Sequence, residues 1–484
     1  MLSNSSLNTS LRTRKRAARR SRHNSCSSTL IVASAGYIAW QLCSSAFLHA
    51  VRPSTYDTSL SFRGQAPHAV APASLRRRWS SDDARTAAAA TTAVAAAATS
   101  ATDTLLAATA LMEGDAALEL PFRERAATLE VPKDYKGPVY RGPDSVDAKF
   151  VRDLLDMYKA EGNLPLKCVY DLTLDVLQLL RKEKSLQRIS IPKESQFTVV
   201  GDLHGQFYDF AYMLEEVTGM PSPENPILFN GDFVDRGDWS LEVLMVLFAF
   251  KLQNPTAVHF NRGNHESEMT NYQYGFAGEV EAKYEAGLME LFSETFRHLP
   301  LAHVLEDQVF VVHAGLPGPE ERLWEDWFPK APDEARKILK REKQVSLDDI
   351  ESVNRVVEPN PMDDPLVIDM LWADPKGSPG YGPSSRVPQV YTFGPDIVKN
   401  FVEANGLKYV IRSHETKTQG YQEGEHMCTV FSAPNYIDRV GNKAAVVVLT
   451  NRDGLLERKF KQFEHQPHPD VPSGAYAPGG ILAP

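Results

Sequence analysis

Cysteine is scarce in this chain of 484 residues, which contains only four. Cys26 and Cys43 lie near the N-terminus, whereas Cys168 and Cys428 are far apart in the sequence. No Cys-x-x-Cys pair occurs, so the sequence excludes a disulfide framework. The four cysteines therefore add little to the functional interpretation of the chain.

Acidic residues are missing from the first part of the chain, where the earliest is Asp57. Residues 1–81 carry twelve Lys or Arg and one Asp, a net charge of +11, so the rest of the chain carries −21 to reach the total of −10. Nucleic-acid binding requires clustered basic residues, because these neutralise the phosphate backbone. The acidic body of the chain therefore argues against a nucleic-acid partner.

The basic start is followed by an apolar run without charges. Seven cations lie between Arg12 and Arg22, and residues 29–51 then form a stretch of 23 residues, long enough to span a bilayer. Residues 47–79 are rich in Ser, Ala and Arg, as organelle transit peptides are. We expect residues 1–81 to be a targeting leader.

Three interpretations of this leader stay open. A signal sequence followed by a transit-like stretch is similar to the two-part leaders of algae with complex plastids; a signal-anchor and a hydrophobic patch in a disordered tail are the others. The first two predict a membrane-associated or organellar protein on the secretory route, in the first case a plastid protein, with membrane contact through residues 29–51. An inactive leader predicts a cytoplasmic protein.

Polar clusters follow three apolar runs in the middle of the chain. The runs are residues 197–200, 227–229 and 258–260, and the clusters are Gly201-Asp-Leu-His-Gly, Gly231-Asp-Phe-Val-Asp-Arg-Gly and Arg262-Gly-Asn-His-Glu. Each run predicts a strand that ends in a polar loop, and helical stretches between the runs predict a β-α-β-α-β unit. Parallel strands place such loops at one sheet edge, where open α/β sheets bind their ligands.

The side chains in these loops suit a metal ion. Asp202 and His204 are two residues apart, so an extended backbone directs both side chains toward one ion. Asp232 is placed to bridge to a second ion, which Asn264 would help to hold. Carboxylate, imidazole and amide oxygen favour Mn²⁺, Fe or Zn²⁺.

The clusters, with further motifs, make the chain similar to the metallo-dependent serine/threonine protein phosphatases, and within them to the type-5 branch. The likeness runs over residues 151–476. The other motifs are His313-Ala-Gly-Leu, Leu371-Trp-Ala-Asp-Pro, Arg412-Ser-His-Glu and Ser432-Ala-Pro-Asn-Tyr, with the type-5 features Phe229-Asn-Gly-Asp-Phe, Gly278-Glu-Val-Glu-Ala-Lys-Tyr and Pro467-His-Pro.

The resemblance implies two divalent metal ions and a set of catalytic residues. The metal ligands would be Asp202, His204 and Asp232 for the first ion, and Asp232, Asn264, His313 and His414 for the second. The two ions would activate a hydroxide for in-line attack on the phosphate. The catalytic residues would be His265 as general acid, Asp235 as its orienting carboxylate, Arg236 and Arg386 as phosphate ligands, and Tyr436 at the rim.

Two glutamates are expected to support the ligands. Glu266 and Glu415 stand beside motif histidines, and ligating imidazoles usually need an acceptor on their other ring nitrogen.

Three departures from the family pattern affect the site. Arg386 lies seven residues before Phe393 rather than six, which predicts that its side chain is rotated relative to the site. Ile437 replaces a cysteine, which changes a contact at the rim. Residues 319–344 form an insert, for which a solvated surface helix is favoured over a docking element.

The expected organisation is a leader at 1–81, a low-complexity linker at 82–137, a catalytic domain at 138–478 and a tail at 479–484. Two helices over residues 150–184 and a second group of strands predict a central β-sandwich flanked by helices, an α/β metallophosphatase fold. The type-5 relatives carry tetratricopeptide repeats, but no repeat of that period precedes Val151, so we expect this chain to lack them.

Hydrolysis of phosphoserine or phosphothreonine in phosphoprotein substrates is the predicted function, with Mn²⁺ favoured and Fe or Zn²⁺ as alternatives. A phosphoesterase acting on small phosphoesters or dinucleotide polyphosphates shares the three clusters, and a non-catalytic scaffold would share the fold. The sequence does not determine the oligomeric state.

Overall fold

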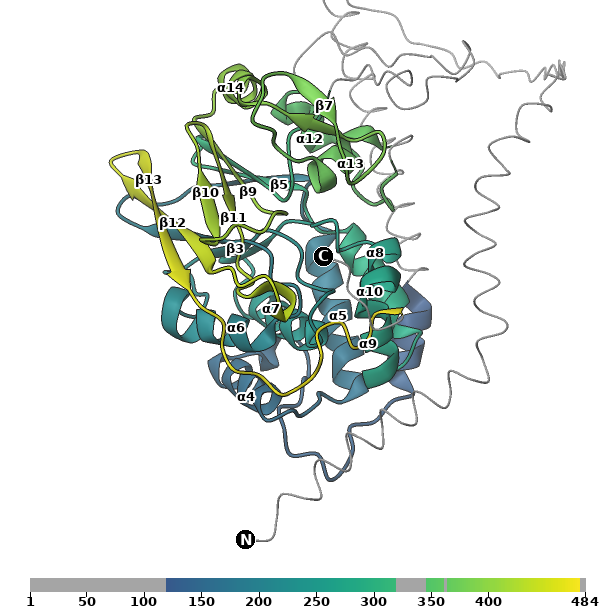
Figure 1. Cartoon of the computed structure of the whole chain (residues 1–484). Coiled ribbons are helices and arrows are strands. Elements are labelled where there is room, and N and C mark those ends of the chain that lie inside the picture. Colours follow the sequence, from purple (N-terminus) through teal and green to yellow (C-terminus); the bar gives the residue numbers. More distant parts are fainter. Residues whose placement is uncertain (1–118, 319–344, 361–363, 479–484) are drawn as a thin grey trace, which may run out of the picture. The chain divides into compact units, whose positions relative to one another are not determined.

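Two β-sheets lie face to face at the centre of the computed structural model, which describes residues 119–318, 345–360 and 364–478 (Figure 1). The first sheet has five strands in the order β13-β12-β2-β3-β4. Their bounds are β2 Gln196–Val200, β3 Ile227–Phe229, β4 Val258–Phe260, β12 Ala444–Arg452 and β13 Leu455–Phe463. Strands β2, β3 and β4 run parallel, as the predicted β-α-β-α-β unit requires, and β12 pairs antiparallel with β2.

The second sheet has six strands in the order β1-β5-β6-β9-β11-β10. Their bounds are β1 Leu186–Ile189, β5 Ala302–Leu305, β6 Val309–Val312, β9 Tyr409–Arg412, β10 Tyr421–Glu423 and β11 Met427–Val430. Strands β6, β9 and β11 run parallel. A separate pair, β7 Tyr381–Pro383 and β8 Tyr391–Phe393, is antiparallel.

Alternation along each strand divides the apolar side chains between two layers. On β12, Val447 and Leu449 point between the sheets, whereas Val446 and Val448 point to the helices outside. The layer between the sheets also takes Val199 from β2 and Val311 from β6. This period of two is what a sheet buried on both faces produces, and it confirms the predicted β-sandwich flanked by helices.

Helices cover both outer faces of the sandwich (Figure 1). The five-stranded sheet packs on a large group, and the six-stranded sheet packs on a smaller one. The larger group includes α4 Ala148–Lys159, α5 Leu166–Leu180, α6 Phe207–Tyr212 with the π-helix η2 Met213–Thr218, α7 Ser240–Gln253, α9 Phe276–Lys283 and α10 Leu288–Arg297. The smaller group is α12 Leu347–Ser352, α13 Pro365–Trp372 and α14 Pro395–Ala404. Three shorter elements are α8 Glu268–Tyr274 and the 3₁₀ turns η1 Pro143–Ser145 and η4 Tyr436–Asp438.

The two helices predicted over residues 150–184 are present as α4 and α5. Asp147 caps α4 by accepting a hydrogen bond from the Phe150 backbone at 2.7 Å, and apolar residues of α4 and α5 are buried in the core shared with the five-stranded sheet. Residues 119–127 form a further helix, in which Glu119 and Ala126 are buried. The linker predicted over 82–137 therefore does not extend through residues 119–137, because this stretch packs on the body.

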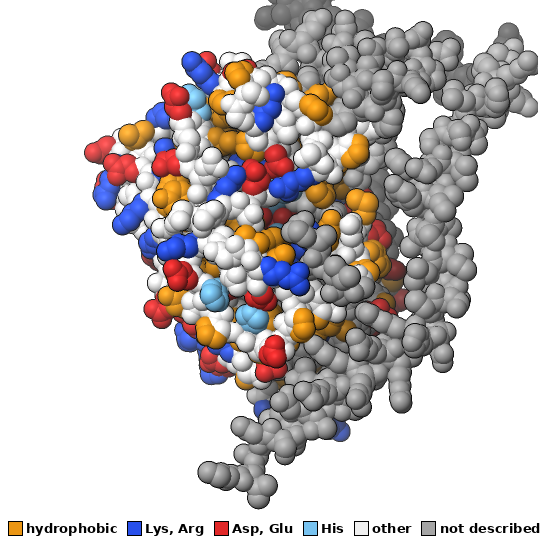
Figure 2. All heavy atoms as spheres, viewed as in Figure 1, with side chains coloured by type: hydrophobic (Ala, Val, Ile, Leu, Met, Phe, Trp, Pro, Cys, Tyr) orange, Lys and Arg blue, Asp and Glu red, His pale blue; other side chains and the backbone are white. Residues whose placement is uncertain are grey.

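Several predictions concern residues outside the described ranges. These are the leader at 1–81 with its apolar run at 29–51, the insert at 319–344 and the tail at 479–484. Within the described ranges, none of the helices combines the length and the apolar character that crossing a bilayer requires. On the face in Figure 2, side chains of both charge signs are interspersed among the described residues.

Candidate metal centre and active site

The loops that follow β2, β3 and β4 carry the first half of the site. Asp202, Asp232 and Asn264 each come a few residues after one of these parallel strands, so the three loops meet at one sheet edge. The backbone nitrogens of Leu203 and His204 both donate to the Asp232 carbonyl oxygen at 2.9 Å. The first two loops are therefore joined directly at the residues that carry the donors.

Several site residues that are not glycine have a left-handed backbone. The φ angles are 48° at His204, 53° at Asp232, 70° at Asp235, 73° at Arg236 and 68° at His414. Such a conformation costs about 1–3 kcal/mol per residue, and it persists only where the surroundings enforce it. Its concentration in these loops marks them as a constrained functional site.

Glu266 is one of the groups that enforce this backbone. Its carboxylate accepts hydrogen bonds from the backbone nitrogens of Asp232 at 2.8 Å, Phe233 at 2.7 Å and Gly263 at 2.8 Å. The side chain thus joins the loops after β3 and β4. The sequence suggested that Glu266 accepts a hydrogen bond from a ligating histidine. The donors to its carboxylate are these backbone N–H groups instead.

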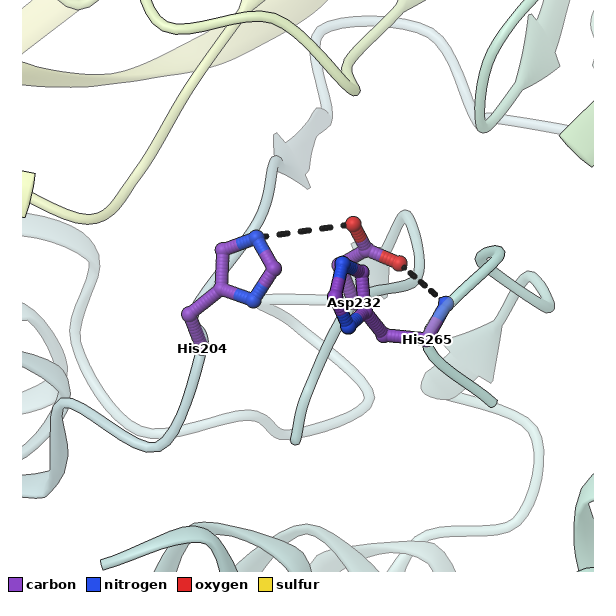
Figure 3. A group of neighbouring side chains, drawn as sticks. All are labelled: His204, Asp232 and His265. Atoms are coloured by element: carbon purple, nitrogen blue, oxygen red, sulfur yellow. Dashed lines mark hydrogen bonds and ion pairs between the residues drawn. The ribbon is translucent and has the colours of Figure 1, made fainter. Parts of the chain in front are cut away.

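Figure 3 shows a first group of donors, in which His204, Asp232 and His265 converge. One donor atom from each of the three side chains lies within 4.8 Å of the others. The Nε2 atom of His204 is 3.5 Å from an oxygen of Asp232 and 3.7 Å from an oxygen of Asp202. All four side chains are buried, so they face one another rather than solvent.

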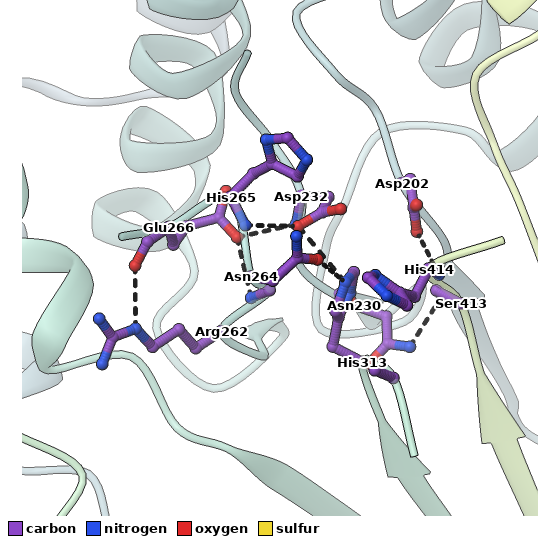
Figure 4. A network of polar contacts seen from close by, with 12 residues as sticks. Asp202, Asn230, Asp232, Arg262, Asn264, His265, Glu266, His313, Ser413 and His414 are labelled. Carbon is purple, nitrogen blue, oxygen red and sulfur yellow. Dashed lines mark hydrogen bonds and ion pairs between the residues drawn. The ribbon is translucent and has the colours of Figure 1, made fainter. Parts of the chain in front are cut away.

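A second group lies on the other side of Asp232 (Figure 4) and consists of Asp232, His313 and His414. The Nε2 atom of His313 is 3.3 Å from an oxygen of Asp232 and 3.0 Å from the amide oxygen of Asn264. His313 follows β6 and His414 follows β9, so this half of the group comes from the six-stranded sheet. Asp232 is shared by both groups, as a carboxylate bridging two ions would be.

The electrostatics of the cluster favour bound cations. Burial and the negative charge of Asp232 raise the pKa of Asp202 to about 7. Burial lowers the pKa of His204 to about 3, which leaves its imidazole neutral and able to ligate. Burial would lower the pKa of His313, but the charge of Asp232 outweighs it and raises the pKa of that imidazole to about 9. Buried carboxylates, the neutral imidazole of His204 and the amide oxygen of Asn264 together fit divalent metal ions.

His265 is held by the carboxylate of Asp235, whereas His204 and His313 are held by backbone carbonyls. Its Nδ1 atom is 2.8 Å from a carboxylate oxygen of Asp235, and that carboxylate also accepts from Asn271 at 3.1 Å and from the Phe276 backbone at 2.9 Å. Burial would lower the pKa of His265, but the charges of Asp232 and Asp235 outweigh it and raise the pKa. The arrangement favours a protonated imidazole with Nε2 directed at the cluster.

Arg236 is placed beside this pair by Tyr274. The guanidinium carbon lies 3.9 Å from the centre of the Tyr274 ring, and the Arg236 backbone nitrogen donates to the Tyr274 carbonyl at 3.2 Å. Stacking of this kind restricts the guanidinium to one plane.

Arg386 reaches the site in spite of its shifted spacing. Its Nη1 atom is 3.2 Å from Nε2 of His414, and its Nε atom is 3.1 Å from Asp374. Asp374 also accepts from Arg412 at 3.0 Å, which anchors it to β9. The rotation predicted from the seven-residue spacing does not remove Arg386, because Asp374 holds the side chain toward His414.

Tyr436 lies over the first group, with its ring centre 4.9 Å from that of His204. Ile437, in place of the family's cysteine, is 4% exposed and packs on Ala477 and Tyr436. It has a left-handed backbone with φ 52°, which is rare for a β-branched residue. Ile437 therefore packs against the Tyr436 ring, and it also lines a surface pocket together with Gln206 and Trp239.

The sequence did not identify the groups that orient the ligand rings. His204 Nδ1 bonds to the Val234 carbonyl at 3.2 Å and His313 Nδ1 to the Asn230 carbonyl at 2.8 Å, whereas Glu415 pairs with Arg412. Backbone acceptors leave no signal in a sequence. Asp374 was also missed, although it lies within the Leu371-Trp-Ala-Asp-Pro motif that supports the family resemblance.

Fold and site together define a calcineurin-like phosphoesterase, and the family model of that description matches residues 195–417. Serine/threonine-protein phosphatase 5 of Solanum lycopersicum is 43% identical over 73% of this chain and 59% of its own length. Serine/threonine-protein phosphatase T of Schizosaccharomyces pombe is 41% identical over 72% of this chain and 68% of its own length.

A solved structure agrees with these relatives. The protein serine/threonine phosphatase of Saccharomyces cerevisiae with similarity to human phosphatase PP5 superposes with a TM-score of 0.59 at 33% identity, over 68% of this chain and all of that chain. The chain therefore belongs to the serine/threonine protein phosphatase family. Within that family it is similar to the type-5 branch. It spans 59–68% of the length of the two curated relatives described above.

One prediction about the family is wrong. A family model described as the PPP5 TPR repeat region matches residues 116–188, so the expectation that this chain lacks such a region does not hold. The matched stretch contains α4 and α5, whose apolar residues are buried in the core beneath the five-stranded sheet.

Proposed function

We propose that this chain hydrolyses phosphoserine and phosphothreonine in proteins. The observation that carries the proposal is the position of Asp232, which is shared by two buried donor groups, and the group that includes His265 places this histidine, held by Asp235, next to the shared carboxylate. A bridging carboxylate between two ion positions, with an acid poised next to it, is the arrangement that in-line displacement at phosphorus needs.

Two divalent ions would be held by the six predicted ligands. Asp202, His204 and Asp232 would hold one ion, and Asp232, Asn264, His313 and His414 the other. We propose Mn²⁺ as the preferred ion, with Fe or Zn²⁺ as alternatives, because all of these accept imidazole and oxygen ligands. When bound, the ions supply a water molecule of lowered pKa and positive charge beside the phosphate.

The chain's own residues bind the phosphate and move the proton. Arg236, stacked on Tyr274, and Arg386, held by Asp374, offer planar forks that match two phosphate oxygens. Asp235 keeps Nδ1 of His265 occupied, so Nε2 is the atom that donates a proton to the departing serine or threonine oxygen. Tyr436 closes the site above His204.

Turnover assays on metal-free protein test this function. We expect Mn²⁺ to restore hydrolysis of phosphoserine and phosphothreonine peptides, with a dinucleotide polyphosphate cleaved far more slowly. Faster cleavage of the dinucleotide would favour the small-substrate phosphoesterase. Absence of any metal-dependent turnover, even of a chromogenic phosphate, would favour the non-catalytic scaffold.

We also propose that residues 1–81 direct the protein to a membrane or organelle on the secretory route. Composition alone supports this proposal: the first 56 residues lack acids, and an uncharged run of 23 residues follows the basic start. Fluorescence imaging of the full chain tests it, and diffuse cytosolic signal would contradict it.

A further inference from the structure

The two halves of the candidate metal site are carried by different sheets. Asp232 and Asn264 follow strands of the five-stranded sheet, whereas His313 and His414 follow strands of the six-stranded sheet. The sheets meet through an apolar layer. Hydrophobic contact is non-directional, so this layer alone does not define how far one sheet edge is displaced along the other. A directional contact between the edges is needed to bring the two halves within ligand distance.

The side chain of Asn230 makes such a contact (Figure 4). Asn230 follows β3, and its Nδ2 atom donates to the carbonyl of Val312 at 2.8 Å and to the hydroxyl of Ser413 at 2.8 Å. Val312 and Ser413 directly precede the two histidines of the second donor group. One amide from the first sheet therefore bonds to both strand ends that present His313 and His414.

Asn261, which follows β4, extends this contact. Its Nδ2 atom donates to the amide oxygen of Asn230 at 2.7 Å and to the Val311 carbonyl at 3.1 Å. Its own amide oxygen is 2.7 Å from Nδ1 of His303 on β5. Because the Val311 carbonyl can only accept, the side-chain atom of Asn261 that faces it has to be the amide nitrogen. The amide oxygen of Asn261 therefore faces His303, which has to donate from Nδ1.

The three side chains are almost completely buried, with exposures of 0% for Asn230, 0% for Asn261 and 1% for His303. Buried polar groups are costly when unpaired, and each of these groups has a partner. A fully bonded buried network specifies one arrangement of the elements it joins. The contact runs from β5 and β6 through both asparagines to the strand ends at the site.

We propose that Asn230, Asn261 and His303 form a cross-sheet amide clamp that sets the distance between the two halves of the metal site. They are positioning residues, since no member of the clamp offers a side-chain donor to either ion. The inference rests on the proposed two-metal function. It predicts that loss of the clamp weakens metal binding more than an equal loss of buried hydrogen bonds elsewhere.

The test compares Asn261→Leu with Asn451→Leu. Asn451 is also buried, at 3% exposure, and its side chain donates to the Ile191 carbonyl at 2.6 Å and accepts from the Gly454 backbone at 2.9 Å. It lies near the end of β12, and both of these partners lie outside the two donor groups. Binding of Mn²⁺ to the metal-free proteins is measured by titration calorimetry, after circular dichroism has shown that each variant is folded.

We expect Asn261→Leu to bind Mn²⁺ at least about 10-fold more weakly than the wild type, as loss of outer groups around ligands does. Asn451→Leu should bind within about twofold of the wild type, because its hydrogen bonds lie outside the clamp. Equal affinities for these two variants would overturn the clamp. A wild-type protein that binds no Mn²⁺ would overturn the proposed function together with the clamp, so the two failures are distinguishable.

A second pair of variants decides the question if Asn261→Leu does not fold. His303→Gln keeps an N–H donor for the amide oxygen of Asn261, whereas His303→Leu removes it. The Gln variant should bind Mn²⁺ like the wild type and the Leu variant more weakly. The same affinity in both would overturn the role of His303 in the clamp.

Discussion

The two sheet edges that meet at the site are built in different ways. At the five-stranded edge, the donors come from three consecutive strand ends, and backbone hydrogen bonds together with the Glu266 carboxylate join the loops. At the six-stranded edge, His313 and His414 are about a hundred residues apart in the chain. The Asn230 side chain bonds to the residue before each of them, and the His414 backbone donates to Asp202 at 3.1 Å. The first edge is thus organised locally and the second by contacts across the sandwich. The effects of substitutions on activity and stability should therefore differ between the two edges.

The largest effect is expected from the acid and from a ligand at the five-stranded edge. His265→Ala removes protonation of the leaving oxygen and should lower kcat by roughly 10²–10⁴-fold. Asp202→Asn weakens a ligand, so added Mn²⁺ should restore part of its activity and should leave His265→Ala unchanged. Titration of Mn²⁺ into both variants under turnover measures this difference. Equal rescue of the two would refute the separation of their roles.

The two arginines compare the edges directly, because Arg236 belongs to the first and Arg386 contacts His414 at the second. Arg236→Ala should lower kcat/KM by about 10²-fold, through both parameters, since phosphate contacts tighten in the transition state. Arg386 is 44% exposed on its side chain but is paired with Asp374, so Arg386→Ala should resemble it. Steady-state kinetics of both variants on one phosphopeptide measure these values. If Arg386→Ala had the kcat and KM of the wild type, Arg386 would have no role in phosphate binding in spite of its position beside His414.

The pH dependence of kcat tests the His265–Asp235 pair. The negative charge of Asp235 helps to raise the pKa of His265, so the protonated acid persists to higher pH. Asp235→Asn removes this charge and lowers that pKa, so activity should be lost at a lower pH than in the wild type. A basic limb that stays in place would mean that His265 is not the group that loses its proton there.

A smaller effect concerns stability, where Glu266 and Glu415 differ. Glu266→Gln replaces an acceptor of three backbone N–H groups by an amide that can accept at only one atom, so unfolding should become about 1–3 kcal/mol easier. Glu415 is 22% exposed and its partner Arg412 retains Asp374, so Glu415→Gln should change stability by less than about 1 kcal/mol. Urea unfolding of the metal-free proteins gives both values. A larger loss for Glu415→Gln would contradict the local organisation of the first edge.

The smallest effect on catalysis is expected from residues outside both edges. A chain that begins at residue 116 keeps Glu119, whose buried carboxylate bonds to Arg181 and Gln178 on the body. It should have nearly the same specific activity in vitro as the full chain. In cells, removal of residues 1–81 should move the protein to the cytosol. Strong activation on truncation, or an unchanged location, would contradict the corresponding half of this prediction.

Much of the five-stranded edge could be predicted from local pattern. Apolar runs followed by Asp202, Asp232 and Asn264 were sufficient to place three parallel strands with donors at one edge, because strand direction and loop position follow from the order of the elements. The donors at the six-stranded edge were harder to predict from the sequence. His313 and His414 follow apolar runs as many buried histidines do, and only their resemblance to a family suggested that they join the first group.

The parts of the site that could not be predicted depend on tertiary contacts, which a sequence does not record. Whether Arg386 reaches His414 is decided by its ion pair with Asp374, and the orientation of His204 and His313 is decided by backbone carbonyls. The order of residues determined which donors the chain possesses and which strands carry them. Only the tertiary structure decided the distances between these donors, because the distances depend on polar contacts between residues far apart in the sequence, which meet across a buried, low-dielectric interior.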